Sequence, residues 1–235
     1  MFAQKTIMAS IRYRGIRGTL RRIVTVLPGV KGDRLTAAEE FDVRYGVDTA
    51  GRIEVEDVGG IGSSKAFAVH YEGTHAPSFL QAIASLKLDY QAFTFMDFGS
   101  GKGLAMLLAS WFSFKRIRGV EFSPELHEVC ERNIRSFRSD KQKCFDIEDI
   151  CADATEVEIP AGPGVYYFFN PFQAPIMRKV LNNIQASYKA SPREMYVIYF
   201  NPLAPETLNE AGFEQVAEIA GHRIYRKAAS RPRAI

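Results

Sequence analysis

The chain has 235 residues and a mass of 26.4 kDa, which suits one large domain or one domain with an extension. Its composition, 46% hydrophobic and 24% charged, excludes a wholly disordered chain, a collagen-like repeat and a small disulfide scaffold. No run approaches the roughly 18 apolar residues that a membrane-spanning helix needs. The cysteines, Cys130, Cys144 and Cys151, lack paired or metal-ligand spacing, so we expect reduced, buried thiols, no metal site and a cytoplasmic protein.

The first 34 residues are strongly basic, although the net charge of the whole chain is only +3. Residues 7–27 mix apolar side chains with arginines, which favours an amphipathic helix that Gly15 and Gly18 weaken. Residues 5–34 are most simply a solvated helix face, because runs of charge usually lie in water. Two alternatives are a contact for nucleic acid or an anionic membrane, and an organelle presequence.

From residue 93 onward, short apolar runs alternate with helical patterns. Residues 93–98 (FTFMDF) predict a buried strand, and residues 104–112 predict an apolar helix. Residues 116–122 (RIRGVEF) predict a second strand, and Ser123 and Pro124 then begin a helix that runs to about residue 137. Further strands are predicted at 144–150, 165–169, 195–200, 214–219 and 222–226, and further helices at 77–86, 174–188 and just beyond Pro205.

This alternation predicts βαβ units that form a parallel sheet with helices on both faces. Ligands of such sheets bind beyond the carboxyl ends of the strands, near the point where the strand order reverses. The functional residues should therefore follow the strands. The residues in these positions are Asp97 to Gly99, Glu121, Asp153, Asn170 with Pro171, and Asn201 with Pro202.

Residues 97–103 (DFGSGKG) join the first of these strands to its helix. Glycines let the backbone turn sharply and approach a ligand, and the following helix presents free N–H groups. The dinucleotide fingerprint G-x-G-x-x-G does not fit, because the sixth position from Gly99 is Leu104. An acid two positions before three alternating glycines instead resembles the first motif of class I S-adenosylmethionine-dependent methyltransferases. The alternative is a tight turn without a ligand.

Two acids follow the next strands. Glu121 ends the second strand, and its two carboxylate oxygens match the adjacent hydroxyls of a ribose. In the methyltransferase family that the sequence resembles, the acid at this position binds the adenosine ribose. NAD enzymes use the same arrangement, and a helix-capping acid is a further alternative. Asp153 and Ala154 resemble the position that meets the adenine in that family. Asp149 or Asp146 could take this place, and an ordinary loop acid is the alternative.

Asn170, Pro171 and Phe172 end the fourth strand. They resemble the N-P-P-Y or N-P-P-F motif of methyltransferases that act on amide or amino nitrogens, but Phe172 replaces the second proline and Gln173 replaces the aromatic residue. An Asn oxygen and a neighbouring carbonyl could hold the N–H groups of an acceptor and direct its lone pair at the methyl carbon. Phe172 is a candidate for an aromatic face beside the sulfonium. The alternative is a strand-ending turn.

Residues 70–74 (HYEGT) precede the predicted helix at 77–86. Together with the glycine loop and Glu121, they are similar in layout to the non-SET histone-lysine methyltransferases, over roughly residues 70–172. A tyrosine-containing loop covers the cofactor in that family, so Tyr71 and Thr74 become candidate lid residues. A structural turn is equally plausible, and the resemblance does not imply a histone substrate.

These patterns predict an α/β, Rossmann-like, doubly wound and mostly parallel seven-stranded sheet with an N-terminal helical or loop extension. Residues 1–87 would form the extension and the cofactor cover, and residues 88–235 the S-adenosylmethionine-binding domain. The predicted function is methyl transfer from S-adenosylmethionine, with a nitrogen of a protein, nucleic acid or small molecule as the favoured acceptor. The alternatives are a nicotinamide-dinucleotide enzyme and a catalytically inactive adaptor that uses its basic arm.

The resemblance assigns residues to two roles. The residues assigned to the acceptor are Asn170, Pro171 and Phe172. The residues assigned to the cofactor are Asp97, Gly99, Ser100, Gly101, Gly103, Glu121, Phe122, Asp153, Ala154, Tyr71 and Thr74. The methyl carbon of this cofactor is already activated, so no metal and no covalent enzyme intermediate are expected.

Overall fold

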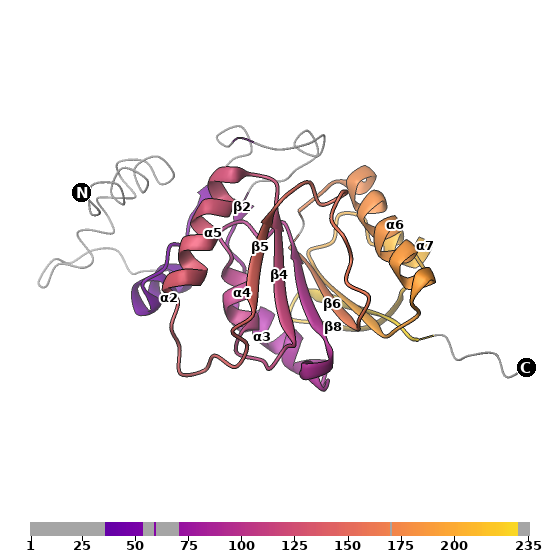
Figure 1. The fold of residues 1–235 in the computed structure, drawn as a ribbon, viewed down its shortest axis with the longest axis horizontal. Helices are drawn as coiled ribbons and strands as arrows, with labels where there is room; N and C mark the ends of the chain where they lie inside the picture. Colours follow the sequence, from indigo (N-terminus) through magenta and orange to yellow (C-terminus); the bar gives the residue numbers. More distant parts are fainter. Residues whose placement is uncertain (1–35, 54–58, 60–70, 170, 230–235) are drawn as a thin grey trace, which may run out of the picture.

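The computed structural model describes residues 36–53, 59, 71–169 and 171–229 (Figure 1). The predicted helix at 7–27 and the basic segment 5–34 lie outside these residues. The strands are β1 (Arg52–Ile53), β2 (Tyr71–Glu72), β3 (Thr94–Phe98), β4 (Arg116–Glu121), β5 (Ile147–Cys151), β6 (Gly164–Phe169), β7 (Met195–Phe200), β8 (Glu214–Ile219) and β9 (His222–Lys227). The helices are α2 (Ala37–Tyr45), α3 (Ala76–Ser85), α4 (Leu104–Ala109), α5 (Pro124–Ser136), α6 (Ala174–Ala190) and α7 (Glu206–Glu210), with a 3-10 turn, η3, at Tyr90–Ala92.

Seven strands form the main sheet in the order β5-β4-β3-β6-β7-β9-β8. Strands β3 to β7 pair in parallel, whereas β9 runs antiparallel to both β7 and β8. The short β1–β2 pair is separate. The order reverses at β3, which lies between β4 and β6. This confirms the predicted Rossmann-like, mostly parallel sheet, and it places the crevice for a ligand beside the carboxyl end of β3.

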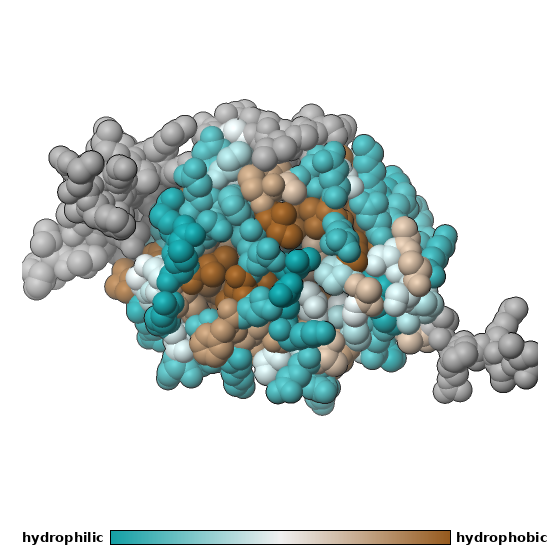
Figure 2. Space-filling view, in the orientation of Figure 1, coloured by the Kyte–Doolittle hydropathy of each residue, from teal (hydrophilic) through white to brown (hydrophobic). Residues whose placement is uncertain are grey.

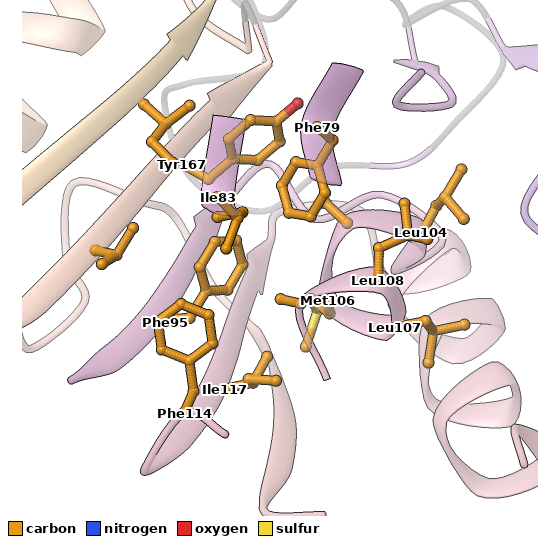
Figure 3. Close-up of a cluster of buried hydrophobic side chains, with 14 of the residues drawn as sticks. Phe79, Ile83, Phe95, Leu104, Met106, Leu107, Leu108, Phe114, Ile117 and Tyr167 are labelled. Atoms are coloured by element: carbon orange, nitrogen blue, oxygen red, sulfur yellow. The ribbon is translucent and has the colours of Figure 1, made fainter. Parts of the chain in front are cut away.

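Helices cover both faces of the sheet, with α3, α4 and α5 on one side and α6 and α7 on the other (Figure 1). Central strands are therefore buried on both faces, which explains why β6 and β7 read as continuous apolar runs. Figure 3 shows the cluster on the α3–α4 side, where Phe79 of α3 meets Tyr167 of β6 edge to face at a centroid distance of 4.9 Å. This packing holds α3 against the sheet at β6.

The observed elements differ from the predicted ones in a few places. The third predicted strand, 144–150, is shifted to Ile147–Cys151, because this edge strand (IEDIC) is too polar to show a clear apolar run. Helix α4 ends at Ala109, three residues before the predicted end. Helix α2 was not predicted, although Thr36 and Glu39 form a capping box at its start.

The surface is mostly hydrophilic in the view of Figure 2, with apolar side chains in smaller patches between charged ones. Among the described residues, the large apolar side chains that are exposed are Val43, Phe145, Leu203 and Val216. No helix in the described part of the chain is long and apolar enough to cross a bilayer.

Candidate functional site

The glycine loop lies between β3 and α4, at the point where the strand order reverses. Gly99, Gly101 and Gly103 all have positive φ, at 82°, 55° and 87°, a backbone conformation that L residues rarely adopt. A Cβ on Gly99 would lie 2.8 Å from Cβ of Pro171, which follows β6. The loop after β3 and the loop after β6 therefore touch, and the absence of a side chain at Gly99 is what lets them meet.

Glu121 ties this loop to the end of β4. Its two carboxylate oxygens accept the N–H of Gly101, at 2.8 Å, and the N–H of Ser123, at 2.9 Å. The side chain is almost fully buried. Burial raises the pKa of Glu121 to about 7, although the backbone N–H groups of Ser123, Gly101 and Phe122 act in the opposite direction. Each carboxylate oxygen has a second lone-pair direction, so Glu121 can still receive hydroxyl groups from a ligand.

Asp97, Glu121 and Asp149 form a cluster of three buried carboxylates around the glycine loop. Burial raises the pKa of Asp97 well above its ordinary value, and the charges of Asp149 and Glu121 add to this effect. Burial also raises the pKa of Asp149, against the hydrogen bonds from its polar neighbours. These bonds come from Ser100 Oγ, at 2.5 Å, and His127 Nδ1, at 2.7 Å. The cluster places three carboxyl groups, whose ionisation burial disfavours, where a ligand would meet the loop.

Asp149 lies in the middle of β5, opposite Gly119 of β4. A Cβ on Gly119 would collide with Asp149 Oδ1 and would lie 2.8 Å from Cβ of Ser100. Gly119 therefore makes room for the Asp149 carboxyl and its bond to Ser100. The Gly-Val-Glu sequence at the end of β4 draws attention to Gly119. Only the parallel register of β4 and β5 identifies Asp149 as the residue opposite Gly119.

Asp153 and Ala154 are both buried just beyond β5. Asp153 Oδ1 accepts hydrogen bonds from the backbone N–H of Thr155, at 2.9 Å, and from its hydroxyl, at 2.8 Å. Asp153 thus shapes the turn after β5, at the same sheet edge as Glu121. Phe122 is half-buried next to Glu121. Asp146, in contrast, forms an exposed ion pair with Arg116, the first residue of β4. This pair lies at the opposite end of the strands from the carboxyl edge.

Sequence reasoning missed Lys102, the lysine inside the glycine loop. Its side chain is fully buried and reaches the segment between α2 and β1. Nζ donates to the carbonyl of Ala50 at 2.7 Å and lies 3.3 Å from Asp48 Oδ1. Asp42 closes this segment by accepting the N–H groups of Thr49 and Ala50 at 2.7 and 3.0 Å. The loop and the N-terminal segment are therefore joined through a buried ammonium group.

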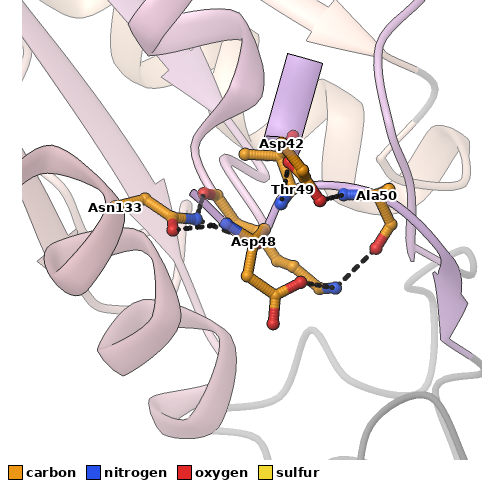
Figure 4. Close-up of polar contacts among 6 residues, drawn as sticks. Asp42, Asp48, Thr49, Ala50 and Asn133 are labelled. Carbon is orange, nitrogen blue, oxygen red and sulfur yellow. Dashed lines mark hydrogen bonds and ion pairs between the residues drawn. The ribbon is translucent and has the colours of Figure 1, made fainter. Parts of the chain in front are cut away.

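Asn133 of α5 makes the same connection from the other side (Figure 4). Its Oδ1 accepts the N–H of Asp48 at 2.8 Å, and its Nδ2 donates to the carbonyl of Asp48 and to that of Lys102, both at 2.9 Å. One buried amide thus satisfies three backbone groups from two segments. No motif in the sequence marks Asn133, because its role depends on long-range contacts.

Residues assigned to the acceptor side are only partly described. Asn170 lies outside the described residues, as does His70. Pro171 lies beside Gly99, whereas Phe172 is buried in the apolar cluster on the α6 face. Thr74 is buried, and its hydroxyl lies 3.4 Å from the phenol oxygen of Tyr167. Tyr71 contributes its backbone to β2.

The cysteines agree with the sequence analysis in part: Cys130 and Cys144 are buried free thiols, and Cys151 is half-buried. Within the residues that the structure describes, no group of histidine, cysteine and acidic side chains is arranged to hold a metal ion.

No protein-family model matches the sequence, and no curated protein matches it. Solved structures do match. A candidate RNA methyltransferase from Pyrococcus horikoshii is 18% identical, with a TM-score of 0.50 over 74% of this chain and 94% of its own. The ribosomal protein L11 methylase of Lactobacillus delbrueckii subsp. bulgaricus is 14% identical, with a TM-score of 0.48 over 71% and 83%. A SAM-dependent methyltransferase from Aquifex aeolicus is 14% identical, with a TM-score of 0.47 over 65% and 92%.

The chain therefore shares its fold with a solved structure described as a methyltransferase, in keeping with the resemblance drawn from the glycine loop and Glu121. At this level of identity the likeness concerns the fold, and the chemistry has to be argued from the site itself.

Proposed function

We propose that this protein is an S-adenosylmethionine-dependent methyltransferase. The observation that carries the proposal is the cluster of Asp97, Glu121 and Asp149, three buried carboxylates at a positive-φ glycine loop where the strand order reverses. Ionising these buried carboxyl groups together is costly unless a cation offsets their charge. S-adenosylmethionine brings a sulfonium and an ammonium group, together with two ribose hydroxyls that suit Glu121.

The same cluster argues against a nicotinamide dinucleotide. In dinucleotide-binding folds the glycine loop receives a pyrophosphate. Here that anion would meet Asp97 and Glu121, both buried and both close to the loop. The charge of the pyrophosphate would add to the cost of ionising these two carboxyl groups in a desolvated site, whereas a cation would reduce it. The spacing of the loop also argues against a dinucleotide, because Leu104 occupies the sixth position from Gly99, where the fingerprint has a glycine or alanine.

In this proposal the cofactor residues keep the roles that the motifs suggest. Asp97 orients the methionine end, and the glycines leave room for the ligand against the backbone. Glu121 holds the ribose, with Phe122 beside it, while Asp153 and Ala154 meet the adenine. Tyr71 and Thr74 cover the mouth of the site. Bound S-adenosylmethionine would supply an activated methyl group, and the protein would supply position and electrostatics.

The acceptor side is proposed to lie at Asn170, Pro171 and Phe172, with nitrogen as the favoured acceptor atom. Pro171 supports this location because it lies against Gly99, beside the proposed cofactor loop. Phe172 supports it less directly, because its ring is buried in the apolar cluster. In this position the ring would hold the loop after β6 in place and would not face the sulfonium. A nitrogen acceptor would give a methylated product that survives mild alkali, unlike a methyl ester.

Calorimetric titration with S-adenosylhomocysteine tests the proposal. We expect the wild-type chain to bind it and Glu121→Ala to bind about 10- to 150-fold more weakly, the range for losing hydrogen bonds to a charged group. Glu128→Ala is the matched control, because Glu128 is an acid of α5 whose side chain is 75% exposed. NAD should give no binding. A wild-type chain that binds NAD but not S-adenosylhomocysteine would overturn the assignment.

A further inference from the structure

A row of side chains continues the site across the sheet, away from the cofactor loop. Phe169 of β6 pairs with Phe200 of β7, and Phe200 pairs with His222 of β9. Tyr167 lies two residues before Phe169 and pairs with Asp97. Because side chains alternate along a strand, all five lie on the face covered by α3 and at the carboxyl edge. This row borders the place where we propose that the acceptor binds.

Aromatic rings pack against one another in this region. The rings of Phe169 and Phe200 stack with centroids 4.8 Å apart and planes inclined by 6°. The imidazole of His222 lies 4.7 Å from Phe200 and 6.0 Å from Tyr167, between centroids. Phe169 and Phe200 are only half-buried at the edge of the sheet. Partly exposed rings in a row at a ligand-binding edge suit an apolar, flat molecule.

His222 is buried, and the hydrogen bonding of its ring is incomplete. Nδ1 lies 3.3 Å from the carbonyl of Ala220. A carbonyl only accepts, so Nδ1 carries the hydrogen and Nε2 presents a lone pair. Nε2 is buried and has no hydrogen-bond partner within the described part of the chain. An unsatisfied buried acceptor is costly, so a ligand hydrogen is the simplest explanation for it.

The surroundings keep this imidazole neutral. Burial lowers the pKa of His222, the carbonyls of Ala220 and Ile219 act against this, and His75 lowers it further. The titratable groups that face it are Tyr167 from β6 and His75 from the start of α3, while β7 and β8 contribute Phe200 and Ile219. Burial raises the pKa of Tyr167 well above its ordinary value, so its phenol stays neutral too. The lone pair on Nε2 is thus present at neutral pH.

We propose that Nε2 of His222 receives the hydrogen of the methyl acceptor, and that this acceptor is an N–H or O–H on an aromatic ring. This inference rests on the proposed function. In the reaction the acceptor atom forms a bond to the methyl carbon and loses one proton, which Nε2 takes. The carbon–sulfur bond breaks, and its electron pair stays on the sulfur.

The chemistry of the base selects this class of acceptor. A neutral imidazole with an ordinary pKa of about 6.5 lies roughly four pKa units below an alkylammonium group of about 10.4. It cannot prepare an aliphatic amine such as lysine for attack at neutral pH. An aromatic amine or phenol is neutral at that pH, and its N–H or O–H becomes acidic as the methyl bond forms. The proposal therefore argues against lysine as the acceptor.

Nuclear magnetic resonance of the full-length protein tests the starting state without any substrate. Long-range proton–nitrogen spectra should show His222 at pH 7 as the neutral form with hydrogen on Nδ1. Protonation should occur below the range of a free histidine. A ring with hydrogen on Nε2 would overturn the proposal, because no lone pair would then face the acceptor.

A binding experiment tests the interaction, with aniline and N,N-dimethylaniline as probes in the presence of S-adenosylhomocysteine. The two rings differ in the N–H that His222 should receive. We expect aniline to bind the wild-type chain about 10-fold more tightly, and n-butylamine to bind at least about 10-fold more weakly than aniline. In His222→Phe, which keeps a buried ring, the preference for aniline should fall to about 2-fold or less. Tyr225→Phe is the control, because Tyr225 is a buried ring of β9 in the opposite apolar cluster.

The outcomes separate this inference from the proposed function. Unchanged affinity for S-adenosylhomocysteine in both variants, with a lost preference only in His222→Phe, supports it. Normal cofactor affinity with the aniline preference intact in His222→Phe, or no binding of either aniline to the wild-type chain, overturns the role of His222 alone. A wild-type chain that does not bind S-adenosylhomocysteine overturns the proposed function, and the role of His222 with it.

Discussion

At the scale of single residues, the central feature is a carboxyl group held in a place that disfavours its charge. Glu121 is buried, close to Asp97 and Asp149, and has a pKa of about 7. Near neutral pH it is therefore divided between its protonated and ionised forms. A cationic ligand would favour the ionised form of Glu121, because opposite charges attract strongly in a desolvated site.

Binding of S-adenosylmethionine at pH 7 should therefore release about half a proton, since a group with a pKa of about 7 is half protonated there. Calorimetry in phosphate and in Tris, which differ in ionisation enthalpy, measures this number. S-adenosylhomocysteine has no sulfonium charge and should release less. Equal binding heats in the two buffers would contradict the prediction, and Glu121→Gln should reduce the release if Glu121 is its source.

At the scale of elements, the hairpin between β8 and β9 is under local strain. Ile219 pairs with His222, so Ala220 and Gly221 form a two-residue turn. Their φ angles are 49° and 81°, the pattern of a type I′ turn. Alanine is a poor residue for the first of these positions, because its Cβ crowds the backbone at positive φ. This turn also supplies the carbonyl that orients His222.

Ala220→Asn should raise the free energy of unfolding by about 1 kcal/mol, since Asn tolerates this conformation and Asn-Gly is the favoured pair. Gly221→Ala is the matched substitution with the opposite sign. It places a Cβ at φ 81°, 3.0 Å from Phe200 Cε2. Urea unfolding of the three proteins measures both effects. A destabilised Ala220→Asn would show that the turn is not strained.

Most elements could be predicted from the sequence, because β6 and β7 are continuous apolar runs, β3 (TFMDF) is mostly apolar and α5 begins at a Ser-Pro pair. The edge strand β5 was placed too early, since an edge strand need not be apolar. The glycine loop and Glu121 were predictable from their order along the chain. The contacts of Lys102, Asn133 and Asp149 were not, because their partners lie 22 to 85 residues away and become neighbours only through strand register and helix packing.

At the scale of the whole molecule, the buried carboxylates make the stability of the ligand-free protein depend on pH. The pKa of Glu121 is about 7 in the folded protein, compared with 4.5 for a glutamate in an unfolded chain. The folded state therefore binds the proton of Glu121 more tightly. The stability that this contributes is complete below pH 4.5 and is lost as the pH rises through 7. Asp97 and Asp149 act in the same direction, because burial raises their pKa values too.

The free energy of unfolding should therefore fall between pH 4.5 and 7.5 more steeply for the wild-type chain than for Glu121→Gln. The difference between 4.5 and about 7 corresponds to on the order of 3 kcal/mol for Glu121. Urea unfolding at several pH values measures the two curves. Glu128→Gln, at an exposed position, should follow the wild-type curve. Parallel curves for wild type and Glu121→Gln would contradict the prediction.

The bond from Lys102 to Ala50 has a consequence for how this chain can be shortened or recombined. A fragment that begins at residue 88 would keep the ammonium group of Lys102 but would lack Asp48 and Ala50, which contact it in the whole chain. A chimera that takes its first 87 residues from another chain would face the same problem, unless the donor offers a carbonyl and an acid in the same places. Residues 36–53 and the glycine loop should therefore be kept together from one parent chain in any truncation or chimera.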